Sequence, residues 1–256
     1  MNNLQVNQYL QNQLNRAPSL LKTYTQDEQG NKYLTRNMFI RVEKLINDFI
    51  AGQREVRMVS IPGLRGVGKT TLLAQVFLQF FPHYSRDMLY ISADQVVNEL
   101  RADLYSVFEE YQKILSIPFE KLDRNLFIFI DEIHFDKKWT AVLKTIYDRS
   151  KKVFVVCTGS SALSLQSTTD LARRVVFEKL YPMNFTEYML LKTGYESIKD
   201  KNRHHQISRK RVKRWGAFTH FNQSADRQSG GKGFTELRQI RYRYLSHDQK
   251  HSFAGC

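Results

Sequence analysis

Apolar residues in this chain gather in short continuous runs, and most runs are followed by a stretch in which apolar residues recur every three or four positions. The runs predict buried strands at 56–61, 88–92, 126–130 and 153–158, with a fifth at 175–180. Near-continuous apolar strands that alternate with helices are typical of a parallel sheet covered on both faces. The pattern therefore predicts an α/β fold with three layers.

The helical spacing is seen in four segments. One begins at Asn37, and the next follows the first strand until Pro82, where we expect the helix to end because proline lacks a backbone N–H. A third apolar face runs over 97–111, and a fourth over 139–147. Residues 1–36 are polar and weakly patterned, so we expect an N-terminal extension with one short helix.

The positive charge of the chain is unevenly distributed. The 39 Lys and Arg residues exceed the 25 Asp and Glu residues by 14, and nine of these excess charges fall in residues 195–256, where apolar residues are sparse. An excess of positive charge is compatible with nucleic acid, an anionic membrane surface or a nucleotide as partner, and it does not favour one of them over the others. The change in composition predicts a patterned domain over 37–194 and a basic tail over 195–256.

Several classes of protein are disfavoured. The two cysteines, Cys157 and Cys256, are too few for a framework of disulfides. The N-terminal residues lack the apolar stretch of a signal peptide, and no segment approaches the roughly 18 apolar residues of a membrane helix. We therefore expect a reduced, cytoplasmic protein without a membrane partner.

The segment GLRGVGKT, between the first strand and the helix after it, fits the phosphate-binding pattern G-x-x-x-x-G-K-[ST]. Glycines let successive backbone N–H groups converge on phosphate oxygens, and the helix N-terminus faces the same charges. Lys69 would reach the β- and γ-phosphates, and the Thr70 hydroxyl would ligate Mg²⁺. The alternative is a glycine turn that precedes Lys-Thr by chance. The expected nucleotide-binding residues are Gly63, Leu64, Arg65, Gly66, Val67, Gly68, Lys69, Thr70 and Thr71.

Two acids, Asp131 and Glu132, end the third predicted strand. At this edge Asp131 could hold Mg²⁺, and Glu132 could polarise a water for attack on the γ-phosphate. The alternative is a pair of solvated acids that cap a turn. Because transfer to a bound acceptor needs no water-activating glutamate, Glu132 favours hydrolysis of the β–γ phosphoanhydride over a kinase reaction.

For the other candidate residues, the position in the sequence does not decide between a functional and a structural role. Thr158 and Ser160 follow the fourth strand, where a polar side chain could sit between the acids and the γ-phosphate, or where a turn of small residues would serve equally. Arg173 and Arg174 could place charge at the transition state, in cis or across a subunit contact, or could be solvated. His134 could contact the γ-phosphate side or could be polar surface.

The chain resembles the AAA-type ATPases of archaea and bacteria, which are close to the signal-transduction P-loop ATPases. The resemblance covers about residues 37–192 and departs from the family after them, where a helical region and a second domain usually follow. The matching blocks are GLRGVGKTTLL (63–73), FIFIDEIH (127–134), Trp139 with AVLKTIYD (141–148), TGSSAL (158–163), TDLARR (169–174) and LYPMNFTEYMLLK (180–192).

The resemblance implies a P-loop NTPase fold with sheet order 5-1-4-3-2. It also implies ATP as the nucleotide, since the GTP-specific motif N-K-x-D is absent from the sequence. It further implies that Ser160 is a polar sensor and that Arg173 or Arg174 resembles an arginine finger.

The basic tail leaves three interpretations open. It could be a DNA- or RNA-binding arm in which Trp215 or Phe218 stacks on bases, a solvated extension, or out-of-frame translation of a damaged gene. The sequence as a whole predicts an ATP-binding, Mg²⁺-dependent ATPase that acts as a switch or motor, with a protein partner or self-association. The alternatives are a nucleic-acid-binding protein that uses the tail and a P-loop small-molecule kinase.

Overall fold

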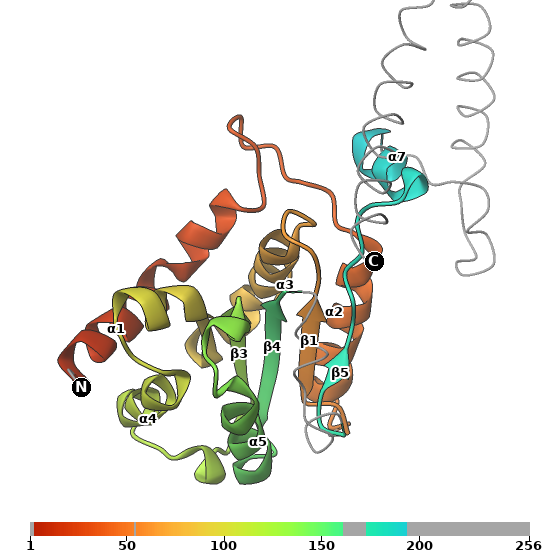
Figure 1. The fold of residues 1–256 in the computed structure, drawn as a ribbon. Helices are drawn as coiled ribbons and strands as arrows, with labels where there is room; N and C mark the ends of the chain where they lie inside the picture. Colours follow the sequence, from red (N-terminus) through yellow and green to blue (C-terminus); the bar gives the residue numbers. More distant parts are fainter. Residues whose placement is uncertain (1–2, 54, 161–172, 194–256) are drawn as a thin grey trace, which may run out of the picture. The chain divides into compact units, whose positions relative to one another are not determined.

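In the computed structural model, five parallel strands form one sheet in the order β2-β3-β4-β1-β5 (Figure 1). The structure describes residues 3–53, 55–160 and 173–193. The strands are β1 (Met58–Pro62), β2 (Met88–Ser92), β3 (Leu126–Asp131), β4 (Val153–Gly159) and β5 (Val176–Phe177). Read from the other edge, this order is 5-1-4-3-2, as the family resemblance implied. The predicted three-layer α/β fold is thus confirmed. The basic tail and the segment 161–172 lie outside the described residues.

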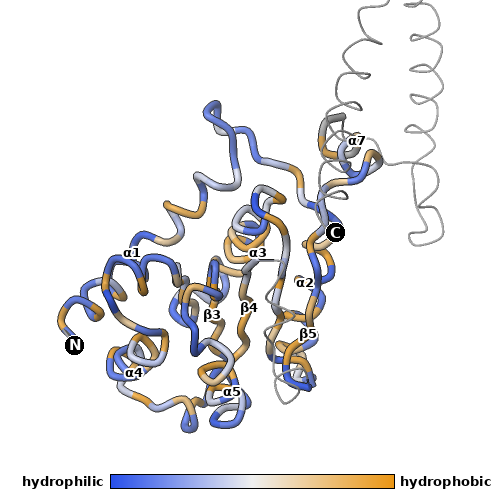
Figure 2. Tube along the Cα trace, viewed as in Figure 1, coloured by the Kyte–Doolittle hydropathy of each residue, from blue (hydrophilic) through white to orange (hydrophobic). Residues whose placement is uncertain are grey.

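The helices cover both faces of the sheet. They are α1 (Asn3–Thr23), α2 (Asn37–Ile50), α3 (Lys69–Tyr84), α4 (Leu104–Leu115), α5 (Trp139–Arg149) and α7 (Phe185–Thr193). Alternate residues of each strand point into opposite layers, because side chains in a strand alternate between faces. Ile128 and Val155 pack with α4 and α5, whereas Phe127 and Phe154 pack with α2 and α3. Figure 2 shows the hydrophobic residues gathered around the sheet.

Helix α1 is longer than the short helix expected for residues 1–36, and it belongs to the core. Its first half buries Val6 and Leu10 in the layer that holds α4 and α5, and its second half buries Ala17 and Leu21 in the layer that holds α2 and α3. In the first half, next to Leu10, the Tyr9 hydroxyl accepts the backbone N–H of Ser92 at the end of β2, at 3.0 Å. Helix α1 therefore packs along β2, the edge strand of the sheet.

The contribution of α1 to stability can be measured with one pair of leucines. Leu10 is fully buried, so Leu10→Ala should lower the free energy of unfolding by about 3 kcal/mol through lost burial and the cavity left behind. Leu4 lies on the same helix but is 64% exposed, so Leu4→Ala should change it by less than about 0.5 kcal/mol. Urea denaturation of both variants provides the comparison. Equal losses would contradict the packing of α1 against the sheet.

Two helix boundaries differ from the predictions. Pro82 lies inside α3, which continues to Tyr84, because a proline in the last turn removes only one hydrogen bond near the helix end. The single helix expected over 97–111 is divided into a π-helical turn (Gln95–Glu99) and α4. Asp103 causes the second start, since its side chain accepts a hydrogen bond from the Ser106 N–H at 2.9 Å as an N-cap.

Strand β5 is shorter than the predicted strand over 175–180, but its pairing with β1 extends beyond the strand. The backbone N–H groups of Glu178 and Leu180 donate to the carbonyl oxygens of Ser60 and Pro62 at 2.9 and 2.8 Å. This pairing brings Leu180 to the start of the phosphate-binding loop. Among the described residues, no helix has the length and apolar character needed to span a membrane.

Candidate functional site

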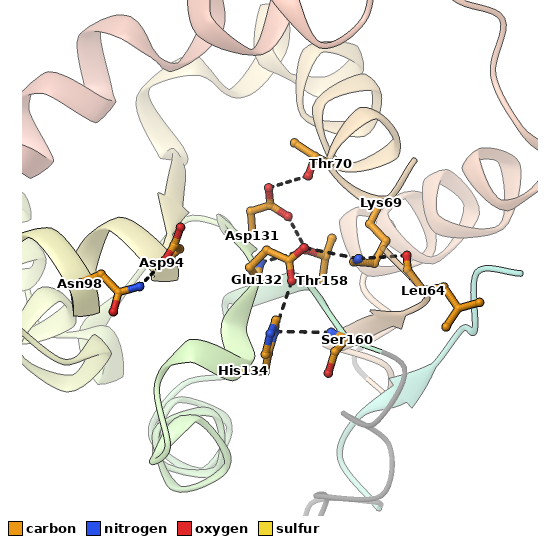
Figure 3. Close-up of polar contacts among 10 residues, drawn as sticks. All are labelled: Leu64, Lys69, Thr70, Asp94, Asn98, Asp131, Glu132, His134, Thr158 and Ser160. Carbon is orange, nitrogen blue, oxygen red and sulfur yellow. Dashed lines mark hydrogen bonds and ion pairs between the residues drawn. The ribbon is translucent and has the colours of Figure 1, made fainter. Parts of the chain in front are cut away.

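The predicted phosphate loop and the two acids meet at the carboxyl ends of β1, β3 and β4 (Figure 3). These three strands are neighbours and run parallel, so the loops that leave them share one edge of the sheet. Lys69 and Thr70 come from the loop after β1, Asp131 and Glu132 from the end of β3, and Thr158 from β4. The structure therefore brings together residues that the sequence separates by about ninety positions.

Glycines shape the loop at three positions. Gly66 and Gly68 have φ values of 82° and 91°, a region that side-chain-bearing residues rarely adopt. A Cβ atom at Gly63 would lie 2.7 Å from the Leu180 carbonyl oxygen, which no real contact allows. Helix α3 begins directly after Gly68 and has no side-chain N-cap and no acid in its first turn. Its first N–H groups are thus available for an anion such as a phosphate.

Lys69 is paired with Glu132. The Lys69 Nζ lies 3.3 Å from Glu132 Oε1 and donates to the Leu64 carbonyl oxygen at 3.3 Å, and its side chain is only 6% exposed. Glu132 has a φ of 51°, so its backbone is in the left-handed region that disfavours a glutamate. Strained backbone of this kind is concentrated at functional sites. Here it turns the carboxylate of Glu132 toward the phosphate loop.

Asp131 is buried between two threonines. The Thr70 hydroxyl donates to Asp131 Oδ2 at 2.8 Å, and the Thr158 hydroxyl donates to Oδ1. Thr158 also accepts the backbone N–H of Glu132 at 3.0 Å. Burial raises the pKa of Asp131 above its ordinary value, and the two hydroxyl groups oppose that shift.

The hydroxyl of Thr70 and the carboxylate of Asp131 fit a hard divalent cation such as Mg²⁺, which prefers oxygen ligands. No group of three or more His, Cys, Asp or Glu side chains that could hold a metal occurs in the described parts of the chain.

Asparagine in place of Asp131 should remove a pH-dependent contribution to the stability of the metal-free protein. Because folding raises the pKa of Asp131, this carboxyl adds to stability below its ordinary pKa, and the contribution is lost as pH rises through the raised pKa. In EDTA, the melting temperature of Asp131→Asn relative to wild type should therefore increase from about pH 4 to about pH 8.

A matched variant tests the sign of this effect. A hydrogen bond from the Asn31 side chain lowers the pKa of Asp27, so Asp27→Asn should lose melting temperature relative to wild type only as pH rises to about 4 from below, and its difference from wild type should be nearly constant from about pH 4 to about pH 8. A melting difference for Asp131→Asn that does not depend on pH would contradict the account.

His134 lies against Glu132 on the side away from Lys69. Its Nδ1 atom is 3.2 Å from Glu132 Oε2, and the backbone N–H of Ser160 donates to the same Nδ1 at 3.4 Å. A ring nitrogen can donate to a carboxylate or accept from an N–H, but it cannot do both at once. The two contacts thus correspond to two proton arrangements of His134. The sensor role expected of the Ser160 side chain stays a prediction.

The structure does not bring Arg173 and Arg174 to the phosphate loop. The Arg174 Nε donates to Asp148 Oδ1 at 3.1 Å, and its guanidinium lies over the Tyr147 ring. Tyr147 and Asp148 lie in the last turn of α5, shortly before β4 begins, so they lie at the amino end of the sheet. Arg173 is exposed at the same end. The role expected of either arginine at the phosphates stays a prediction.

One contact to the loop was not anticipated. The Arg36 Nη1 donates to the Val67 carbonyl oxygen at 2.8 Å. Nothing in the spacing of residues around Arg36 marks it, because it stands alone between two helices and its partners lie far away in the sequence.

Comparison with known proteins gives one family and several partial relatives. The sequence profile of a family described as "AAA domain" matches residues 55–189. An uncharacterized protein of Methanocaldococcus jannaschii is 32% identical over 195 residues, which is 73% of this chain and 38% of that protein. An uncharacterized protein of Haemophilus influenzae is 29% identical over 133 residues, 50% of this chain and 32% of that protein. The chain thus spans about a third of the length of these relatives.

Solved structures resemble the chain more loosely. The structure of C. elegans PCH-2 has a TM-score of 0.37 and 18% identity, and it aligns with 77% of this chain and 49% of its own. The FIGL-1 AAA domain in complex with ADP has a TM-score of 0.41 and 14% identity, with 64% and 61% of the two chains covered.

Proposed function

The chain belongs to the AAA domain family, and from this premise we propose that it binds ATP at the loop 63–71 and hydrolyses it with Mg²⁺. Membership of the family makes it a nucleotide-binding P-loop protein. The observation that supports hydrolysis is that Lys69 and Thr70 directly face Glu132 and Asp131, at 3.3 and 2.8 Å. A phosphate-binding pair and an acidic pair are thus already in contact.

Each of these residues has one task in the proposed reaction. Lys69 leaves Glu132 for the β- and γ-phosphate oxygens when ATP binds. Thr70 and Asp131 would hold Mg²⁺, which would neutralise charge on the phosphates when bound. Glu132, released from Lys69, accepts a proton from a water whose oxygen attacks the γ-phosphorus, while the bond to the β–γ bridging oxygen breaks. Thr158 keeps Asp131 in place through its hydrogen bond.

Phosphate release by the purified chain tests this function. With ATP and Mg²⁺ the chain should release inorganic phosphate, and EDTA should stop the release. The γ-phosphate should be recovered as free phosphate and not on an acceptor, which separates hydrolysis from the kinase alternative. A chain that binds ATP but transfers its phosphate to an acceptor molecule would contradict the proposed reaction.

Action as a switch or motor for a larger assembly in the cytoplasm is part of the same proposal. Its support is that the chain spans 38% of the M. jannaschii relative, so the domain is joined to further sequence there. A role for Arg173 or Arg174 would be exercised through self-association.

The charge of residues 195–256 supports a second candidate function, which is DNA or RNA binding. These residues carry nine of the fourteen net positive charges, and basic side chains bind phosphates through release of counterions. A chain shortened to residues 1–194 should then lose salt-sensitive DNA binding and keep its ATPase activity. DNA binding that persists in the shortened chain would place the contact elsewhere.

A further inference from the structure

Arg36 connects the phosphate loop to α7. It lies just before α2, and its Nη1 donates to the Val67 carbonyl oxygen of the loop at 2.8 Å. The Nε and Nη2 groups donate to Glu187 Oε1 and Oε2 of α7 at 2.9 and 2.7 Å. Nη2 also donates to the Tyr181 carbonyl oxygen at 2.9 Å. One guanidinium thus joins three segments that are distant in the sequence.

The pair of Arg36 and Glu187 is well shielded from solvent. Both side chains are only 11% exposed, and the two parallel hydrogen bonds form the bidentate arrangement that fixes a guanidinium in one orientation. Arg41 and Glu178 form a second Arg–Glu pair from α2, at 3.2 Å, but the Arg41 side chain is 56% exposed. Of these two pairs, Arg36–Glu187 has the rigidity needed to position the Val67 carbonyl group.

The hydrogen bond to Val67 fixes a peptide plane of the loop. The Val67 carbonyl and the Gly68 N–H belong to one trans peptide, so they point in opposite directions. When Arg36 holds the carbonyl on one side, the Gly68 N–H is directed to the other side, where consecutive N–H groups of such loops surround phosphates. Gly68 has a φ of 91° and no side chain of its own to restrict it. The hydrogen bond from Arg36 to the Val67 carbonyl oxygen therefore holds the Gly68 amide in its orientation.

Helix α7 depends on polar contacts at its start. Tyr181 and Phe185 are largely exposed, so the chain entering α7 buries little apolar surface there. Glu187 in the first turn of α7 is the acid that meets Arg36. A change in the position of Arg36 would thus affect the seating of α7, by which we mean the contact that α7 makes with Arg36 through Glu187.

We propose that Arg36 is a positioning residue of the phosphate loop and that the pair Arg36–Glu187 couples nucleotide binding to the seating of α7. The proposal rests on the proposed function, since it assumes that the loop binds nucleotide. Coupling is reciprocal. If bound nucleotide stabilises the contact of α7 with Arg36, this contact raises the affinity for nucleotide by the same factor. Glu187 acts on the loop only through Arg36.

ADP binding and hydrogen exchange measured on the same variants test the coupling. Arg36→Met should weaken ADP binding about tenfold, because a charged hydrogen bond that orders the loop is lost. At saturating ATP its kcat should stay within about twofold of wild type, because Arg36 contacts neither Glu132 nor Asp131. Arg41→Met, which removes the exposed pair, should bind ADP like wild type.

Hydrogen exchange of residues 185–193 provides the second measurement. ADP should slow this exchange in wild type, and the effect should be lost in Arg36→Met and in Glu187→Gln, which keeps the arginine and its contact with Val67. Wild-type ADP affinity in Arg36→Met, or equal slowing in wild type and both variants, would overturn the coupling. If wild type binds ADP without any change at 185–193, the coupling alone fails. If wild type binds no nucleotide, the proposed function fails with it.

Discussion

Glutamine in place of Glu132 should leave ATP bound and stop its turnover, with a fall in kcat of about 100-fold or more. The reason is that glutamine keeps the size and the hydrogen-bonding reach of the side chain but cannot accept a proton from water. The geometry favours this separation of binding from chemistry, because among the described residues the Glu132 carboxylate contacts the phosphate loop through its ion pair with Lys69, at 3.3 Å. Phosphate release and retention of labelled ATP on a filter give the two quantities.

Glu178→Gln is the matched control for the glutamate. Glu178 lies after β5 and pairs with the exposed Arg41, so its replacement should leave both turnover and retention unchanged. Turnover by Glu132→Gln at the wild-type rate would show that another group activates the water. His134, 3.2 Å from Glu132, would then be the next residue to test.

Alanine in place of Lys69 should weaken ATP binding by about 100-fold or more. An ammonium group that bonds to phosphate oxygens in a site shielded from water contributes about 1.5 to 3 kcal/mol for each such bond. Lys69 is only 6% exposed and begins α3, so no solvent competes strongly for its charge. Titration with a fluorescent ATP analogue measures the dissociation constant.

The control for the lysine is Lys44→Ala. Lys44 is an exposed residue of α2, and its removal changes the net charge by the same amount. It should bind ATP like wild type. If Lys69→Ala binds ATP within about threefold of wild type while its melting temperature is unchanged, the loop does not bind phosphates as proposed.

The strands and the phosphate loop could be predicted because each has a local signal. A fully buried parallel strand is a continuous apolar run, and β2 begins and ends where its run does. The loop requires glycine where φ is positive or the backbone is crowded, and those positions are fixed within eight residues. The meeting of Thr70 with Asp131 then follows from the shared carboxyl edge of the sheet.

Other features have signals that are weak or not local. The buried positions of α1 are spaced as a helix requires, but they include Gln13 and Ala17, which add little hydrophobicity. Arg36 finds Glu187 at a separation of 151 residues, which no periodicity can indicate. The position of Arg174 follows from topology, because a residue before a parallel strand lies at the end of the sheet opposite to a residue after one.

Helix α1 also has a consequence for the solubility of shorter fragments. β2 is an edge strand, and an uncovered edge offers unpaired N–H and C=O groups to strands of other molecules. A fragment that begins at residue 36 keeps Arg36 and its contact with the phosphate loop, yet it uncovers this edge and the apolar side chains that pack against Leu10 and Leu21. We therefore expect the fragment without the N-terminal helix to aggregate by strand addition more readily than a chain that keeps this helix.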